Sequence, residues 1–173
     1  RHGETVWSAQ GRVQGRSDPA LSDKGREQAG RLGVRLRRTA FARIVSSDLG
    51  RSVQTARCAL PDAHVHLDPR LHELDFGRWE GRTWGEVAAD DPDALSAWHG
   101  NPYLCTPTEG ETYAALTERT QLWLESLPKT GRVIAFTHGG PIRSLLYGLT
   151  GVPDAHTWRF ELGPTSLTKV TLG

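Results

Sequence analysis

RVIAFTHGGPIRSLLYGL, residues 132–149, decides the fold of this chain. It opens with a short apolar run, Val133 to Phe136, which is typical of a strand buried on both faces of a sheet. His138 and two glycines follow, and Pro141 stands at a first helical position, where the missing N–H has no intrahelical partner to lose. Apolar residues at 142, 145, 146 and 149 then recur at helical spacing. The stretch therefore predicts a strand, a turn that carries His138, and a helix.

The same alternation recurs upstream of this stretch. Residues 21–38 carry small and apolar residues at positions 29, 32, 33 and 36, which predicts an amphipathic helix with Ser22 as its N-cap. Residues 43–46 predict a short buried strand. Ser47 or Asp48 can cap the helix that follows.

That helix is expected to carry Arg51 in its first turn, and residues 111–127 predict a further helix. The last two apolar segments, residues 158–162 and 167–172, predict strands near the edge of the sheet. Residues 83–108 are less regular, and their Trp and Pro content predicts a helical excursion that caps the site.

Strands that alternate with helices predict an α/β fold, here a three-layer sandwich with a mostly parallel central sheet and helices on both faces. We expect a single domain over residues 1–173. Sites in such sheets lie at the carboxyl ends of the strands, where both His138 and the turn from Ser46 to Arg51 fall.

Composition narrows the function classes. The net charge of +1 gives no reason to expect nucleic acid or a membrane as partner, and no apolar run approaches the ~20 residues of a spanning helix. Cys58 and Cys105 match no metal-binding spacing, and a reduced, cytoplasmic setting is favoured. Because the chain opens with Arg1 and contains no Met, we expect residues before it, including a first strand, and the printed sequence does not decide whether a signal peptide precedes them.

Four segments carry chemistry: RHGET at 1–5, SSDLGRSVQTA at 46–56, HELDFGRWEG at 72–81 and THGG at 137–140. Together they supply two histidines, two arginines and a carboxylate at loop or strand-end positions. A neutral imidazole can attack phosphorus, arginines bind phosphoryl oxygens in bidentate fashion, and a carboxylic acid can protonate a leaving alkoxide. This inventory predicts phosphoryl transfer that requires no metal or other cofactor.

These segments resemble the opening, middle and closing motifs of the histidine phosphatase superfamily, in the family's order and over nearly the whole chain. GRVQGRSDPALSDKGREQA at 11–29, EGET at 109–112 and FTHGGPIRSLL at 136–146 complete the pattern. The resemblance implies that His2 is the phospho-accepting nucleophile and that Glu73 is the proton donor and later the base. It implies that the phosphoryl group is surrounded by Arg1, Arg51 and His138.

The resemblance also implies contacts farther from the phosphorus. The outer mouth of the pocket would be lined by Arg12, Gln14 and Gly15, and the Gly139 N–H would bind a phosphoryl oxygen. Ser8 stands where family mutases carry an asparagine, which weakens its assignment to phosphate binding. His2 must be neutral, so its other ring nitrogen is expected to donate to a backbone carbonyl.

Other conspicuous residues have ordinary interpretations. A metal site on His2, Glu73 and His138 is disfavoured because arginines at the same place repel a cation. The remaining histidines (His64, His66, His72, His99 and His156) are expected in loops or at the surface. Core packing is favoured over a substrate contact for the three tryptophans Trp79, Trp84 and Trp98, and solvent exposure over substrate binding for Arg78 and Arg82.

Three functions remain open: a hydrolase of small phosphate monoesters, a phosphoglycerate mutase, and a non-catalytic phosphate-binding domain. Mutases of this superfamily carry extra segments that exclude water, and 173 residues leave little room for them, so the phosphatase is preferred. A pure binding domain would have no use for a carboxylate at Glu73. The expected partner is a small-molecule phosphate ester, and the protein is expected to be a monomer or a homodimer.

Overall fold

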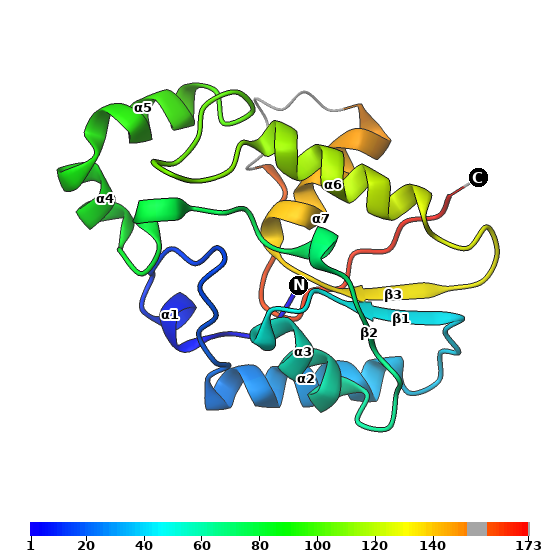
Figure 1. Cartoon of the computed structure of the whole chain (residues 1–173). Helices are drawn as coiled ribbons and strands as arrows, with labels where there is room; N and C mark the ends of the chain where they lie inside the picture. The colour runs from blue at the N-terminus through cyan, green and yellow to red at the C-terminus, as the bar shows by residue number, and fades with distance from the viewer. Residues whose placement is uncertain (152–158, 173) are drawn as a thin grey trace.

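The computed structural model describes residues 1–151 and 159–172 (Figure 1). Its sheet has three parallel strands in the order β2-β1-β3: β1 (Arg43–Ser46), β2 (His66–Leu67) and β3 (Val133–Phe136). Val45 is paired with Ala135 on one side and with His66 on the other. The parallel α/β architecture predicted from the sequence is confirmed.

Helices cover both faces of this sheet, as Figure 1 shows. On one face lie α2 (Asp23–Leu36) and α3 (Gly50–Ala59), which pack on each other and enclose a core with Ile134 and Phe136. On the other face lie α6 (Tyr113–Glu125) and α7 (Gly139–Thr150). Within β3, buried residues alternate with half-buried ones, so the strand is less enclosed than its apolar run predicted.

Local signals explain where most helices begin. The Ser22 hydroxyl accepts a hydrogen bond from Gly25 N at 3.0 Å, which caps α2 as predicted. The Thr112 side chain caps α6. Pro141 is the third residue of α7 rather than the first, because the helix already begins at Gly139. A proline is still tolerated there, since N–H groups of the first turn have no intrahelical partner.

The cap predicted for α3 is wrong. Its N-cap is Leu49, and neither Ser47 nor Asp48 caps it. The Asp18 carboxylate, 33 residues away in sequence, instead accepts hydrogen bonds from the backbone N–H groups of Gly50 and, at 3.1 Å, Arg51. The start of α3 is thus set by a tertiary contact.

The two predicted C-terminal strands are also wrong as far as the structure describes them. Residue 158 lies outside the described residues, and residues 159–162 and 167–172 form no strand. Nearby, Thr165 N donates to His2 O, and the amino group of Arg1 donates to Ser166 O. Leu167, Val170 and Leu172 are exposed, because no strand pairs with this segment among the described residues.

The segment between β2 and α6 builds a second cluster. It contains two 3₁₀ turns, η1 (Pro69–Leu71) and η2 (Gly77–Trp79), and the helices α4 (Trp84–Asp90) and α5 (Pro92–Gly100). Trp79 and Trp98 are buried at its centre, with only 1% of each exposed. Figure 1 shows α4 and α5 standing to one side of the sheet, above the short α1 (Val6–Ala9).

None of the helices in the described ranges has the length and apolar character needed to cross a bilayer.

Candidate active site

His2 lies just beyond the carboxyl end of β3, with 2% of its surface exposed. Its backbone N donates to Thr137 O at 2.8 Å, which fastens the N-terminal segment to the strand end. Its Nδ1 lies 2.7 Å from the carbonyl oxygen of Gly3. Because a carbonyl can only accept, Nδ1 carries the proton and Nε2 keeps its lone pair. The hydrogen bond expected from the sequence is present.

The surroundings hold this imidazole neutral. Burial, with the positive charges of Arg51 and Arg1, keeps the pKa of His2 well below its ordinary value. Burial and the Arg51 charge do the same to the pKa of His138. The two rings lie side by side, with centroids 5.1 Å apart.

His138 is the N-cap residue of α7 and is completely buried. Its Nε2 lies 2.9 Å from the Ser47 hydroxyl, whose oxygen accepts from Leu49 N at 3.3 Å and whose hydrogen is free to point at Nε2. With the hydroxyl donating to Nε2, the proton of this ring resides on Nδ1. Nδ1 is buried and has no hydrogen-bond partner within the described part of the chain.

Arg51 is also completely buried, in the first turn of α3. Its NH1 donates to Ser17 O and its NH2 to Gly15 O, each at 2.7 Å, and the Asp18 carboxylate lies 3.6 Å from NH1. Burial lowers the pKa of this guanidinium, while the Glu73 and Asp18 charges oppose that shift. Its Nε has no partner among the described residues, so a buried donor remains for an anion.

Arg1 approaches the same place from the N-terminus. Its NH1 donates to the carbonyl oxygen of Leu162, and its Nε is buried without a partner in the described ranges. Burial lowers the pKa of this guanidinium, and the Glu73 charge counters the effect. Around His2 there are thus three buried nitrogens with unused hydrogen-bonding capacity, one each on Arg1, Arg51 and His138. A phosphoryl group has the oxygens to engage them.

Glu73 lies at the N-terminus of α7. Its Oε2 accepts from Gly139 N at 3.1 Å, and its Oε1 accepts from Gly140 N and Leu74 N, both at 2.9 Å. A helix N-terminus is a favourable place for a carboxylate. The Gly139 N–H, expected to bind a phosphoryl oxygen, donates to Glu73 in this structure.

A pocket of about 270 Å³ opens beside these groups, and Arg1 and Glu73 form part of its wall. Two of the three residues expected at the mouth, Arg12 and Gln14, line it, and so does Ser8. The remaining wall includes the aromatic rings of Phe76 and Trp84.

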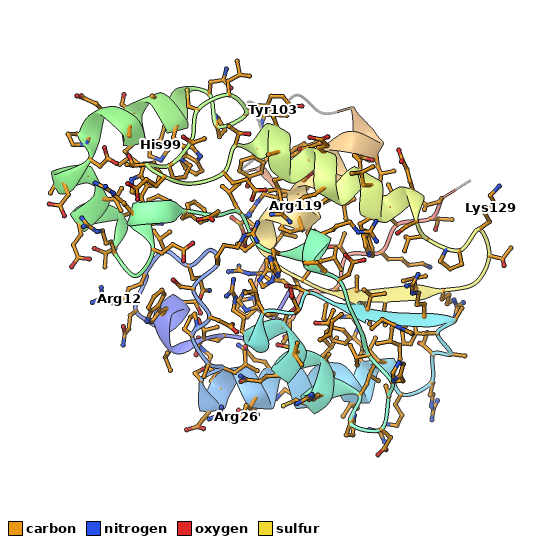
Figure 2. The ribbon with its side chains drawn as sticks, in the orientation of Figure 1. Arg12, Arg26, His99, Tyr103, Arg119 and Lys129 are labelled. Atoms are coloured by element: carbon orange, nitrogen blue, oxygen red, sulfur yellow. The ribbon has the colours of Figure 1, made fainter. Side chains whose placement is uncertain are left out.

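The side chains of Ser8, Arg12 and Gln14 are each held by hydrogen bonds to neighbouring residues. The Gln14 amide oxygen accepts from the Thr5 hydroxyl at 2.7 Å, and the Ser8 hydroxyl accepts from Thr5 N in the capping box of α1. Arg12 donates to Gly81 O at 2.7 Å and lies at the edge of the molecule in Figure 2.

Gly15 does not line this pocket. A Cβ at this position would lie 2.2 Å from a Glu80 carboxylate oxygen and 2.5 Å from Leu74 O. Its carbonyl holds Arg51, so the glycine is needed for a close approach behind the arginine.

The sequence reasoning missed three residues that hold the site in place: Asp18, Glu80 and Arg119. The Glu80 carboxylate accepts from Arg16 N and Ser17 N at 2.7 and 2.6 Å, which fixes the loop that binds Arg51. Arg119 projects from α6 toward the middle of the molecule in Figure 2. Glu80 lies inside the quoted HELDFGRWEG motif and Asp18 inside the quoted segment 11–29, whereas nothing in the sequence around Arg119 signals a role.

The other histidines differ in their surroundings. His64, His66 and His99 are exposed, as expected. His72 is half-buried, because its ring is held between Asp48 and Arg16. His156 lies outside the described residues. No three His, Cys, Asp or Glu side chains gather in a metal-binding arrangement anywhere in residues 1–151 and 159–172.

Trp79 and Trp98 pack the core as favoured, whereas Trp84 lines the pocket and is 42% exposed. Arg78 is exposed and pairs with Glu109, and Arg82 pairs with Asp90.

Several known proteins that are similar to this chain are named as probable phosphoglycerate mutases or as phosphatases. A probable phosphoglycerate mutase, GpmB, of Erwinia tasmaniensis is 34% identical over 98% of this chain and 81% of its own length. The adenosylcobalamin/alpha-ribazole phosphatase of Salmonella typhimurium is 32% identical over 94% of this chain and 83% of its own.

Among solved structures, a mycobacterial glucosyl-3-phosphoglycerate phosphatase in complex with VO3 superposes with a TM-score of 0.81 at 32% identity, covering 96% of this chain and 87% of its own. The family model described as histidine phosphatase superfamily (branch 1) matches residues 1–173. With that match, the chain belongs to branch 1 of the histidine phosphatase superfamily.

Proposed function

We propose that this protein is a metal-independent phosphatase that hydrolyses small phosphate monoesters through a phosphohistidine on His2. The observation that carries the proposal is the state of the His2 ring. Its Nδ1 proton is bound to Gly3 O, its pKa is held low by burial and two arginines, and its Nε2 is left as a neutral nucleophile. Relatives that bear phosphatase names support the hydrolytic direction.

In the first step, Nε2 of His2 attacks phosphorus, and the bond from phosphorus to the ester oxygen breaks. Arg1, Arg51 and His138 stabilise the phosphoryl oxygens, because their unpaired nitrogens are already buried and need not be desolvated during the reaction. Glu73 delivers a proton to the departing oxygen. A carboxyl group that carries this proton keeps lone pairs for its three backbone N–H partners.

In the second step, water attacks the phosphohistidine, and the Glu73 carboxylate accepts the proton from that water. The N–P bond breaks, inorganic phosphate leaves, and His2 returns to its neutral state. The mutase alternative differs only here, because the phosphoryl group passes from His2 to a hydroxyl of the substrate instead of to water. Its specific support is the name of several relatives, probable phosphoglycerate mutase GpmB.

We further propose that residues 83–108 act as a cap on a single domain. Trp84, the first residue of α4, stands in the pocket wall opposite the N-terminal segment. The backbone of Val13 is hydrogen-bonded to Gly81 and Arg82, just before the cap, and Arg12 at the pocket mouth pairs with Thr83, the first residue of the cap.

The test is phosphate release from p-nitrophenyl phosphate in excess EDTA. We expect activity to survive EDTA, to disappear in His2→Ala and to persist in His64→Ala, a matched control because His64 is exposed. Glu73→Gln should slow turnover of alkyl phosphates by about 10²-fold or more while inorganic phosphate still binds. Loss of activity in EDTA, or retention of it in His2→Ala, would overturn the proposal. Conversion of 3-phosphoglycerate to its isomer without phosphate release would establish the mutase instead.

A further inference from the structure

Trp84 differs from the two tryptophans beside it. Trp79 and Trp98 are each 1% exposed, whereas Trp84 is 42% exposed and lines the same pocket as Glu73. Leaving an indole partly exposed to water is unfavourable, and a ligand ring placed against it would remove that cost. Phe76 contributes a second aromatic surface to that pocket.

The indole is also held rigidly. Its ring stacks on Trp98 at 5.9 Å with an interplanar angle of 19°, and Phe76 and Trp79 meet it edge-to-face at 6.0 and 6.3 Å. The capping box between Thr83 and Glu86 fixes the start of α4, where the indole is attached. A preorganised aromatic wall binds a flat apolar group at little entropic cost.

The surroundings of the Arg12 guanidinium, at the mouth of the pocket, also favour a neutral ligand. Arg12 donates to Gly81 O and to the Gln10 side chain, and its NH1 lies 3.5 Å from the Glu86 carboxylate. Its charge and donors are therefore partly used within the protein. A second anionic group on the substrate would have to compete with Glu86 for this arginine, whereas a neutral ring would not.

We propose that the physiological leaving group is an alcohol whose body carries an aromatic or similarly flat apolar ring, stacked on Trp84 and bounded by Phe76. This inference rests on the proposed phosphatase function and names the substrate class of the same pocket. It excludes small, charged alcohols such as glycerate as preferred leaving groups. Trp84 is then a residue that determines specificity and takes no part in bond breaking.

The test compares 3-phenylpropyl phosphate with propyl phosphate, two esters whose leaving oxygens are chemically alike. For the wild-type enzyme we expect kcat/KM to be about tenfold higher for the phenyl ester, the ratio that about 1.4 kcal/mol of added contact produces. Trp84→Ala should bring the ratio close to one, and Trp84→Phe should retain most of it. Leu122→Ala, which removes an exposed side chain on α6, should leave it unchanged.

The possible results distinguish a failure of the aromatic leaving group from a failure of the proposed phosphatase activity. Equal rates for the two esters in the wild-type enzyme, or a preference for 3-phosphoglycerate over the phenyl ester, overturn the aromatic leaving group while the phosphatase stands. Activity that persists in His2→Ala instead removes the proposed function itself. If Trp84→Ala does not fold, the wild-type ratio and the Trp84→Phe ratio still decide.

Discussion

Replacing Arg119 with methionine is expected to displace Glu73, the proposed general acid, while leaving the Glu73 side chain itself unchanged. All of the terminal nitrogens of Arg119 are engaged: its NH1 donates to Arg70 O and His72 O at 2.8 Å, and its NH2 donates to Glu73 O at 3.0 Å. Its Nε and NH2 also form a bidentate pair with the Glu111 carboxylate at 2.8 and 2.9 Å. The Arg119 side chain thus holds the backbone from Arg70 to Glu73 in place.

The magnitude follows from burial. The side chains of Arg119 and Glu111 are only 16% and 14% exposed, so removing one partner leaves a largely buried charge and unpaired carbonyls, at a cost of about 3 kcal/mol. Burial alone would raise the pKa of Glu111, but the hydrogen bonds and charge of Arg119 outweigh it, and the pKa is lowered. A displacement of Glu73 by about 1 Å would slow reactions that need its proton by about 10²-fold.

The assay uses two leaving groups. Propyl phosphate needs a proton on its departing oxygen, whereas p-nitrophenolate departs readily without one. We expect Arg119→Met to lower kcat/KM, which reports on ester cleavage and not on the shared hydrolysis of the phosphohistidine, about 10²-fold for propyl phosphate and only a few-fold for p-nitrophenyl phosphate. Arg119→Lys should fall between, because it keeps the charge but loses the planar fork.

Arg31→Met is the matched control, since Arg31 is 77% exposed in a surface pair with Glu27. Denaturant unfolding of each variant separates lost stability from lost positioning. An equal fall in kcat/KM for both esters would refute the reasoning, because a general loss of folded enzyme cannot distinguish leaving groups.

Three further predictions follow from close contacts and buried charges. Gly140→Ala would place a Cβ 2.2 Å from Glu73 Oε1, so we expect the same leaving-group dependence as for the arginine variant, here from a direct contact with the carboxylate, measured with the same two esters. Gly15→Ala, which meets backbone at 2.5 Å, should cost about 1–3 kcal/mol of unfolding free energy, whereas Gly30→Ala, in open space on α2, should add about 0.5–1 kcal/mol, both read from urea unfolding. Burial holds the pKa of His138 well below its ordinary value, so below about pH 6.5 the unfolded chain binds a proton that the folded chain does not, and stability should fall with pH by up to about 1.4 kcal/mol per unit. His2, whose pKa is also lowered, contributes a slope of its own, so His138→Gln should reduce the slope by up to about 1.4 kcal/mol per unit without abolishing it, and an unchanged slope would show that His138 is protonated in the folded protein.

The parts of this molecule that sequence reasoning predicted are those with local causes. Ser22 caps its own helix, and the run from Val133 to Phe136 forms its strand. His138 follows that strand directly, so its place at the strand end needed no knowledge of the rest of the fold. Glu73 was assigned from a motif, and its position at the N-terminus of α7 emerged only from tertiary structure.

The features that were missed depend on partners far away in sequence. Asp18 caps α3 across 32 residues, and Arg119 holds the Glu73 segment across 46. Apolar content alone suggested a strand at 167–172, but a strand also needs a neighbour to pair with, and composition does not reveal one. Trp84 illustrates the same limit, because three tryptophans close in sequence divide into two core residues and one pocket residue only through the packing of the cap.

The most direct test of the central claim is to trap the phosphorylated enzyme. Enzyme mixed with radiolabelled phosphate ester and quenched within one turnover should carry label that is stable in alkali, is lost in acid and maps to the peptide that contains His2. His2→Ala should carry none. Label on another residue, or turnover with no labelled enzyme at any quench time, would contradict a phosphohistidine mechanism.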